Sequence, residues 1–162
     1  MKTHLLSAGK KGQHAFLLAG ILLLLSFASS ATTYYVSPLG NDNTGTGTLA
    51  NPWKTLRKAT STVTAAGNTI HLVAGTYTET QASSLAPGVS LEGEGLATTI
   101  VISNITGQWS NLLSLSSGQD TNGNQSISGI TFDGQYVNET TDKTWIAIWI
   151  TGRSNVVIHD FK

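Results

Sequence analysis

The sequence predicts an all-β protein whose short strands stack into a parallel β-solenoid. Short runs rich in Ile, Val and Leu are separated by Gly, Asn or Ser, a pattern typical of strands and turns. The last of these runs recur at an offset of 31 residues, and each repeat is too short to contain a crossover helix. Strands without a local partner must then pair with the equivalent strand of the next repeat, so that the repeats stack.

The N-terminal segment, residues 1–31, is predicted to be a secretory signal peptide. Three lysines lie within the first 11 residues, and residues 15–27 form an apolar run that is followed by small residues. The run is shorter than the roughly 20 residues that a membrane-spanning helix needs. We therefore expect a secreted or cell-surface protein without stable membrane insertion after cleavage; the alternative is an uncleaved membrane anchor.

Composition limits the partners of the mature chain. Removal of residues 1–31 from the 162 residues leaves 131, with six basic and nine acidic residues and a net charge of −3. No basic stripe remains, so we expect no nucleic-acid partner. The chain has no cysteine, and an exported form must therefore be held by core packing and backbone hydrogen bonds rather than by disulfides.

Residues 32–68 are expected to form an N-terminal strand, a loop and a capping helix. Residues 33–36 are β-branched or aromatic, and residues 37–48 are nearly all turn formers. A helix is predicted from its N-cap at Thr55 to Ala66, where one weakly apolar face ends before Gly67. Placed before the first coil, this helix would cover the otherwise exposed end of the solenoid.

Residues 69–162 are predicted to form the first coils. Residues 124–131 align with residues 155–162, which places Ile127 on Ile158 and repeats an asparagine that would form a hydrogen-bond ladder. A β-sandwich is the alternative, but it does not explain the repeated offset. The predicted strands are residues 70–73, 89–91, 99–102, 112–115, 127–132, 146–150 and 156–161.

Several short motifs resemble the N-terminal segment of secreted right-handed parallel β-helix proteins of the pectate-lyase-like superfamily. They are the Tyr-Tyr-Val-Ser opening at 34–37, the Gly-Asn-Asp loop at 40–42, the Pro-aromatic-Lys-Thr-Leu helix start at 52–56 and the Gly-Thr-Tyr sequence at 75–77. Residues 88–101 and 127–134 look like the coils that follow. The resemblance covers roughly residues 33–162, and it implies a right-handed parallel β-helix.

The resemblance also implies an activity: lyases of this group cleave acidic polysaccharides such as pectate, alginate or chondroitin by β-elimination. The reaction needs a cation at the uronate carboxylate, often Ca²⁺, and a Lys or Arg base. Ca²⁺ is therefore the cofactor implied for a full-length protein. Calcium prefers clustered carboxylates, whereas Asp133 and Asp160 fall out of register and Asp120, Glu139 and Asp142 are isolated in turns.

A polysaccharide could bind beside residues 143–153. Lys143 and Arg153 flank a predicted strand that carries Trp145 and Trp149, and an aromatic ring beside a cation suits a stacked sugar. Trp145, Trp149 and Arg153 are therefore the candidate substrate-binding residues. The alternative is that the tryptophans pack under a loop. Catalytic and metal-binding residues are not identified by the sequence.

Two histidines lie in predicted strands. His71 alternates with Ile70 and Leu72, so we expect it on the outer face of its strand. His159 lies beside a buried strand, where a structural role is commoner than that of a general base. Neither is a candidate site residue.

The end of the sequence leads to a further expectation. Lys162 aligns with Thr131 in mid-strand, and no polar cap follows. We therefore expect an incomplete fragment of a longer β-helix protein that is inactive alone. The first functional hypothesis is an extracellular polysaccharide lyase. The alternative is a non-catalytic adhesin or carbohydrate-binding solenoid, since a fold does not fix a function, and a nonfunctional remnant is a third possibility.

Overall fold

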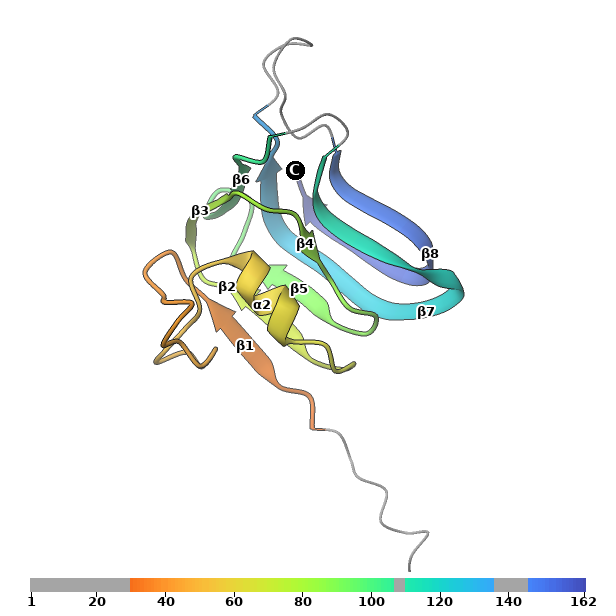
Figure 1. Cartoon of the computed structure of the whole chain (residues 1–162), viewed down its shortest axis with the longest axis horizontal. Helices are drawn as coiled ribbons and strands as arrows, with labels where there is room; N and C mark the ends of the chain where they lie inside the picture. The colour runs from red at the N-terminus through yellow and green to blue at the C-terminus, as the bar shows by residue number, and fades with distance from the viewer. Residues whose placement is uncertain (1–29, 107–109, 136–145) are drawn as a thin grey trace, which may run out of the picture. The chain divides into compact units, whose positions relative to one another are not determined.

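The computed structural model of the chain describes residues 30–106, 110–135 and 146–162 (Figure 1). The chain divides after Ser30, and every element below belongs to the second unit, Ala31–Lys162. The predicted signal peptide lies almost entirely outside the described residues. Within the described ranges, no helix is long and apolar enough to cross a membrane.

The second unit is built on one curled sheet of parallel strands. Its main path begins with β1 (Thr33–Val36), β2 (Thr69–Leu72) and β5 (Ser90–Gly93), each paired with the next in parallel. The middle of β7 (Asn111–Asp133) pairs with β5, and β8 (Ile146–Phe161) pairs with β7 on its other side. The predicted all-β, parallel arrangement is therefore confirmed, and its half-barrel curvature is compatible with a β-solenoid.

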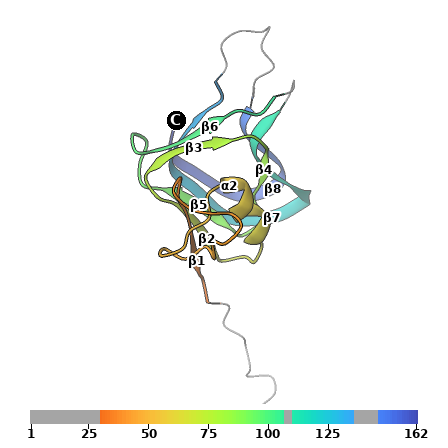
Figure 2. The same cartoon turned by 60° about the vertical axis from the view of Figure 1, so that its left-hand side comes forward.

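The sheet curls because β7 pairs with a different strand at each stage of its path. Its start pairs with β4 (Ser83–Ser84), and its end pairs with β6 (Thr99–Ser103). Strand β6 in turn pairs with β3 (Gly75–Glu79), again in parallel. Figure 2 shows β3 and β6 side by side, on a different side of the curl from β1, β2 and β5. The segment that contains β2 and β3 thus pairs with β5 and β6 of the next coil, as predicted.

The register of β7 and β8 confirms the repeat seen in the sequence. Ile127 pairs with Ile158, which lies 31 residues further along the chain. Leu113 pairs with Ile148, 35 residues away, and register shifts within the connecting turn absorb the difference. One rung of the predicted asparagine ladder is present, because the Asn155 side-chain amide donates to Asn124 Oδ1 at 3.4 Å.

Inward side chains of successive strands form a continuous core. Ile70, Leu91 and Ile127 occupy one row of the register, and all are fully buried. Burial of each such side chain stabilises the fold by about 1.5–3 kcal/mol. At the β1 end, the rings of Tyr34 and Trp53 stack with their centroids 5.6 Å apart. The stacked rows are therefore compatible with the predicted solenoid.

Helix α2 (Leu56–Thr62) begins where the sequence predicted. Thr55 is its N-cap, and its hydroxyl accepts a hydrogen bond from the Lys58 amide at 3.1 Å. Leu56 and Ala59 are fully buried within the hydrophobic core, and the helix contacts β1 to β4. The helix is thus part of the core at the N-terminal side of the sheet.

The predicted helix end at Ala66 is wrong by four residues. Val63 already has an extended conformation with φ −91° and ψ 100°, and its N–H bonds back to the Ala59 carbonyl. The last helical residues and those after them are mostly threonine and valine, whose branched side chains favour extended backbone. The sequence periodicity could not show where this preference takes over.

Candidate functional site

A row of small hydroxyl side chains crosses β4, β7 and β8 and includes an exposed tryptophan. Ser84 pairs with Ser114, and Ser114 pairs with Trp149. Ser116 pairs with Thr151 one step further along the same strands. We call this row the serine–tryptophan strip, made of Ser84, Ser114, Ser116, Trp149 and Thr151.

The strip faces away from the core. In β7 its serines alternate with Leu113 and Leu115, which are fully buried, so the serine side chains point outward. Trp149 is 46% exposed, an unusual fraction for so large a ring. An exposed aromatic face among small hydroxyls can stack on the apolar face of a sugar ring and leave its hydroxyl groups free for hydrogen bonds.

A polar hollow of about 230 Å³ lies at the turn that follows the strip. Thr151 ends the strip, and Gly152 already lines the hollow. Asp120 contributes a carboxylate and Arg153 a guanidinium to the wall, so both signs of charge are present. The lining residues are Gln119, Asp120, Gly152, Arg153 and Ser154.

Arg153 ties several segments together. Its guanidinium donates to the carbonyl oxygens of Leu85 (2.9 Å) and Ser116 (3.1 Å). It also donates to Gln125 Oε1 at 3.0 Å and to Ser117 Oγ at 3.1 Å. Four of the five N–H donors of the side chain are used in these bonds. Partial burial lowers the pKa of Arg153 from its ordinary value.

The structure places two of the three predicted substrate-binding residues. Trp149 lies in the strip, and Arg153 lines the hollow four residues further along β8. Trp145 lies outside the described residues. The roles assigned to these side chains stay predictions.

Sequence reasoning missed the serine row. Ser84 belongs to a strand of only two residues, which is too short for a recognisable pattern. The alternation of Leu113, Ser114 and Leu115 was the available signal, since it indicates one buried and one exposed face. Which strands become neighbours depends on the stacking, and only the structure supplies that.

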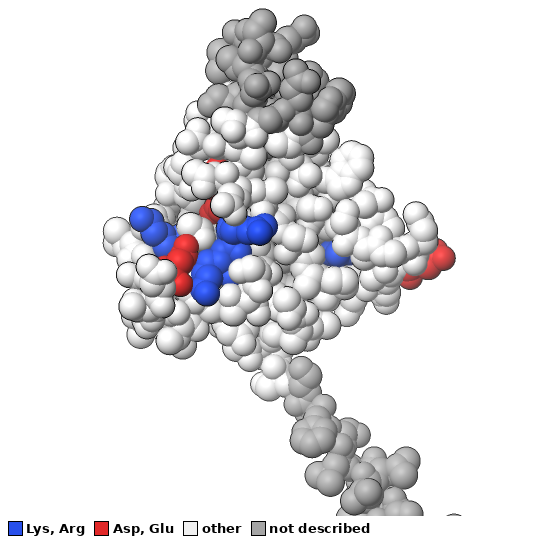
Figure 3. All heavy atoms as spheres, viewed as in Figure 1, with Lys and Arg blue, Asp and Glu red and all other residues white. Residues whose placement is uncertain are grey.

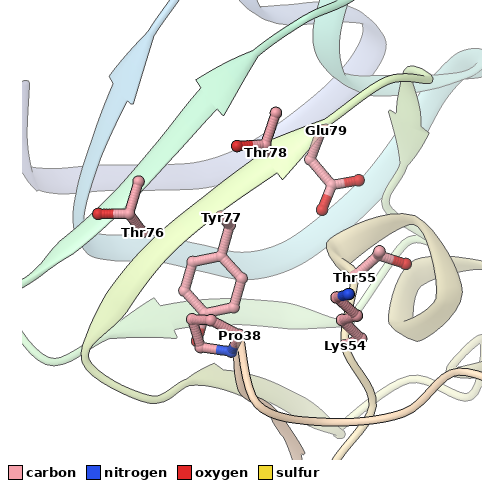
Figure 4. Close-up of a pocket in the computed structure, with 7 residues that line it drawn as sticks. All are labelled: Pro38, Lys54, Thr55, Thr76, Tyr77, Thr78 and Glu79. Carbon is pink, nitrogen blue, oxygen red and sulfur yellow. The ribbon is translucent and has the colours of Figure 1, made fainter.

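A second hollow, of about 320 Å³, lies between β3 and the start of α2 (Figure 4). Glu79 is only 2% exposed there, and its carboxylate points toward the helix. It accepts hydrogen bonds from the amides of Leu56 (2.7 Å) and Arg57 (3.3 Å). The lining residues are Pro38, Lys54, Thr55, Thr76, Tyr77, Thr78 and Glu79.

Glu79 is a structural anchor that the sequence did not reveal. Burial raises the pKa of its carboxyl, and the two amide hydrogen bonds partly offset this. Asp42 adds a second carboxylate, which accepts from the amide and the hydroxyl of Thr55 at 3.1 and 2.7 Å. The first-turn amides of α2 are therefore bonded within the protein, and we assign this hollow to the framework of the fold.

The described residues do not fit the calcium site implied by the resemblance. In the described ranges, no three or more His, Asp or Glu side chains are grouped so as to hold a metal ion. Figure 3 shows few acidic atoms on the face it presents, while Lys and Arg atoms gather over α2. Calcium dependence stays a prediction for a longer protein.

Comparison with known proteins gives no match: no family model, no curated protein and no solved structure matches this chain. The resemblance to the pectate-lyase-like superfamily therefore stays a prediction from the sequence, although the curled parallel sheet is compatible with the fold that it implies.

Proposed function

We propose that this protein is an extracellular carbohydrate-binding β-helix whose serine–tryptophan strip contacts the saccharide. The observation that carries the proposal is the register that aligns the outward hydroxyls of β4, β7 and β8 beside the exposed ring of Trp149. Neighbouring parallel strands hold this row on a regular backbone, which limits the conformational entropy lost when a ligand binds.

The chemistry of the strip favours a neutral stretch of saccharide. Its five side chains carry no formal charge, so binding would depend on stacking and hydrogen bonds. Such binding is weakly sensitive to salt, in contrast to recognition of a polyanion by basic residues. Arg153, at the end of the strip, has one N–H left that can donate a hydrogen bond to a single carboxylate of the ligand.

The fold proposal is a right-handed parallel β-helix of the pectate-lyase-like superfamily, with α2 as its N-terminal cap. The parallel stacking and the buried face of α2 support it. Secretion by way of a signal peptide at residues 1–31 is part of the same proposal. It is supported by the apolar run that follows three lysines.

Calorimetry with the full chain tests the binding proposal. The probes are a soluble neutral glucan and polygalacturonate, each at low and high salt. We expect Trp149→Ala to weaken binding at least tenfold, because a stacking platform is lost. Leu39→Ala is the matched control, since Leu39 is 96% exposed outside the strip and should leave affinity unchanged. Equal affinity of Trp149→Ala and wild type, or no binding of either probe, would contradict the proposal.

A polysaccharide lyase is the second candidate, and Arg153 is the observation that favours it. The guanidinium lines the hollow beside Asp120, where its positive charge would neutralise the carboxylate of a bound uronate. Release of unsaturated uronate from polygalacturonate or alginate, with and without Ca²⁺, measures this activity directly. Absence of the unsaturated product under all these conditions would remove the lyase candidate and leave the binding proposal intact.

A further inference from the structure

His71 lies between two carboxylates on the outer face of the sheet. Its Nδ1 is 2.8 Å from Glu92 Oε1, and its Nε2 is 3.2 Å from Glu94 Oε1. The His71 side chain is 20% exposed, whereas those of Glu92 and Glu94 are 48% and 42% exposed. The predicted outward position of His71 is therefore confirmed, and the two glutamates are partners that the sequence did not indicate.

A doubly protonated imidazole satisfies both contacts. An ionised carboxylate only accepts hydrogen bonds, and a neutral imidazole has one N–H donor and one acceptor nitrogen. With neutral His71, one of the two carboxylates would face a nitrogen lone pair. Both contacts are hydrogen bonds only when both ring nitrogens carry a proton.

The groups around His71 come from several elements. Tyr35 of β1 places its ring centroid 5.4 Å from that of His71, at a tilt of 56°. Glu92 lies opposite His71 in the register of β2 and β5. Glu94 follows β5, accepts a backbone hydrogen bond from Ala74, and interacts electrostatically with Tyr77 of β3. Glu94 thus joins the β2–β3 connection to the β5–β6 connection.

The titration behaviour agrees with the geometry. Partial burial alone would lower the pKa of His71, but the hydrogen bonds and charges of Glu92 and Glu94 outweigh it and the pKa is raised above 6.5. The hydrogen bond from His71 is the main cause that lowers the pKa of Glu94 below 4.5. Protonated His71 and ionised Glu94 therefore coexist over a window that includes mildly acidic pH.

We propose that His71, Glu92 and Glu94 form a pH-sensitive clasp between two coils, closed by the imidazolium and opened at Glu94 when the ring loses a proton. Glu92 is held in place by the backbone pairing of β5. Glu94 stands outside the ladder, between two glycines, and Gly95 has φ +127°. The Glu94 amide donates to Thr99 Oγ1 at 2.9 Å, so the backbone is held and it is the exposed side chain that can rotate away. Its departure also frees the Ala74 amide.

The clasp is independent of the proposed saccharide surface. It lies on β2 and β5, whereas the serine–tryptophan strip lies on β4, β7 and β8.

The raised pKa of His71 determines how the stabilising effect of the clasp changes with pH. The clasp stabilises the fold fully below pH 6.5, down to the range in which Glu94 becomes protonated, and this stabilisation is lost as pH rises through the pKa of His71.

NMR titration of the full chain tests this inference. We expect the His71 ring to titrate above pH 6.5 in the wild type and the Ala74 amide resonance to shift with the same midpoint. Glu94→Gln should lower the midpoint of His71 and abolish the coupled shift of Ala74. Asp133→Asn removes one carboxylate outside the clasp and serves as the control for long-range charge, with both effects retained.

Two results would overturn the clasp. One is a His71 midpoint at or below 6.5 in the wild type. The other is an Ala74 amide whose resonance does not follow the titration of His71, since Glu94 would then stay in place. Because the wild-type titration alone can decide the matter, the test does not depend on whether any variant folds.

Discussion

At the scale of single residues, the side chains that bind the stack together are polar. Arg153 and Gln125 form one network, in which Gln125 is 5% exposed and its amide donates to the Val89 carbonyl at 2.8 Å. Glu79 holds the start of α2 in a similar way. Each group satisfies backbone atoms of another segment, so the loss of one leaves buried partners without a hydrogen bond.

Arg153→Ala should destabilise the protein by about 2–4 kcal/mol, because it leaves Gln125 Oε1 and the Leu85 carbonyl without their donor. Urea unfolding measures the change. Arg57→Ala is the control: Arg57 is exposed and its guanidinium donates to the Ala82 carbonyl at the surface, so its loss should cost less than about 1 kcal/mol. Equal costs for the two variants would argue against the network.

The buried carboxyl of Glu79 should make the free energy of unfolding fall as pH rises, whereas a salt-bridged carboxylate would make it rise. Burial raises its pKa above 4.5, so the native state binds this proton more readily than the unfolded state. The contribution of Glu79 to stability should therefore fall as pH rises from 4.5 through its native pKa. Unfolding free energies from pH 4 to 6, below the titration of His71, should show this decline in wild type and in the control Asp133→Asn, and not in Glu79→Gln.

At the scale of elements, the corners between strands require special backbone conformations. Gly129 has φ +70°, and a Cβ there would collide with the carbonyl oxygen of Gly93 in the preceding coil. Asp160 occupies the corresponding position of the next coil with φ +46°, which aspartate tolerates better than most residues. The corner thus depends on the residue type at one position in each coil.

Gly129→Ala should cost about 2 kcal/mol or more, because it adds both left-handed strain and a backbone clash. Gly118→Ala is a matched control from the same strand, since a Cβ at Gly118 meets no atom within 4 Å. Thermal unfolding should show a lower Tm for Gly129→Ala than for wild type, whereas the Tm of Gly118→Ala should be close to that of wild type. A Tm for Gly129→Ala equal to that of wild type would show that the corner can relax.

The sequence predicted most elements, and its failures have local causes. Repeated apolar rows determined the strand positions and the pairing of Ile127 with Ile158, because inward side chains must stack. It missed β4, which has no pattern of its own, and placed the end of α2 too late. For the site it indicated Trp149 and Arg153, but not the serines beside the ring or the glutamates beside His71, which come together only through stacking.

At the scale of the whole molecule, burial declines toward β8. Ile127 and Ile130 of β7 are fully buried, whereas their partners Ile158 and Phe161 in β8 are 37% and 42% exposed. Residues of one type in one row therefore make unequal contributions to the core. The buried hydrophobic side chains of the described residues all lie between Val36 and Phe132, before β8 begins.

Ile127→Ala and Ile158→Ala form a matched pair, because the two residues face each other in the register. The first should cost about 2–5 kcal/mol, as expected for a fully buried isoleucine, and the second should cost clearly less. Denaturant unfolding gives both values. A larger cost for Ile158→Ala would mean that β8 is buried in solution by a contact absent from this structure.

The central claim is that the coils stack in parallel and in register. This stacking brings together the residues of the serine–tryptophan strip, of the hollow beside Arg153 and of the His71 clasp. The chain has no cysteine, so an introduced pair reports directly on register. Ser90 and Ser126 lie in adjacent strands with their hydroxyl oxygens 3.4 Å apart, which is close enough for a disulfide after substitution by cysteine.

The most direct measurement is therefore the oxidation of Ser90→Cys/Ser126→Cys, followed by mass spectrometry. We predict a rapid intramolecular disulfide in this variant and none in Ser90→Cys/Ser128→Cys, in which the partner is displaced by two residues along the strand. Cross-linking of the displaced pair, or of neither pair, would contradict the stacked register.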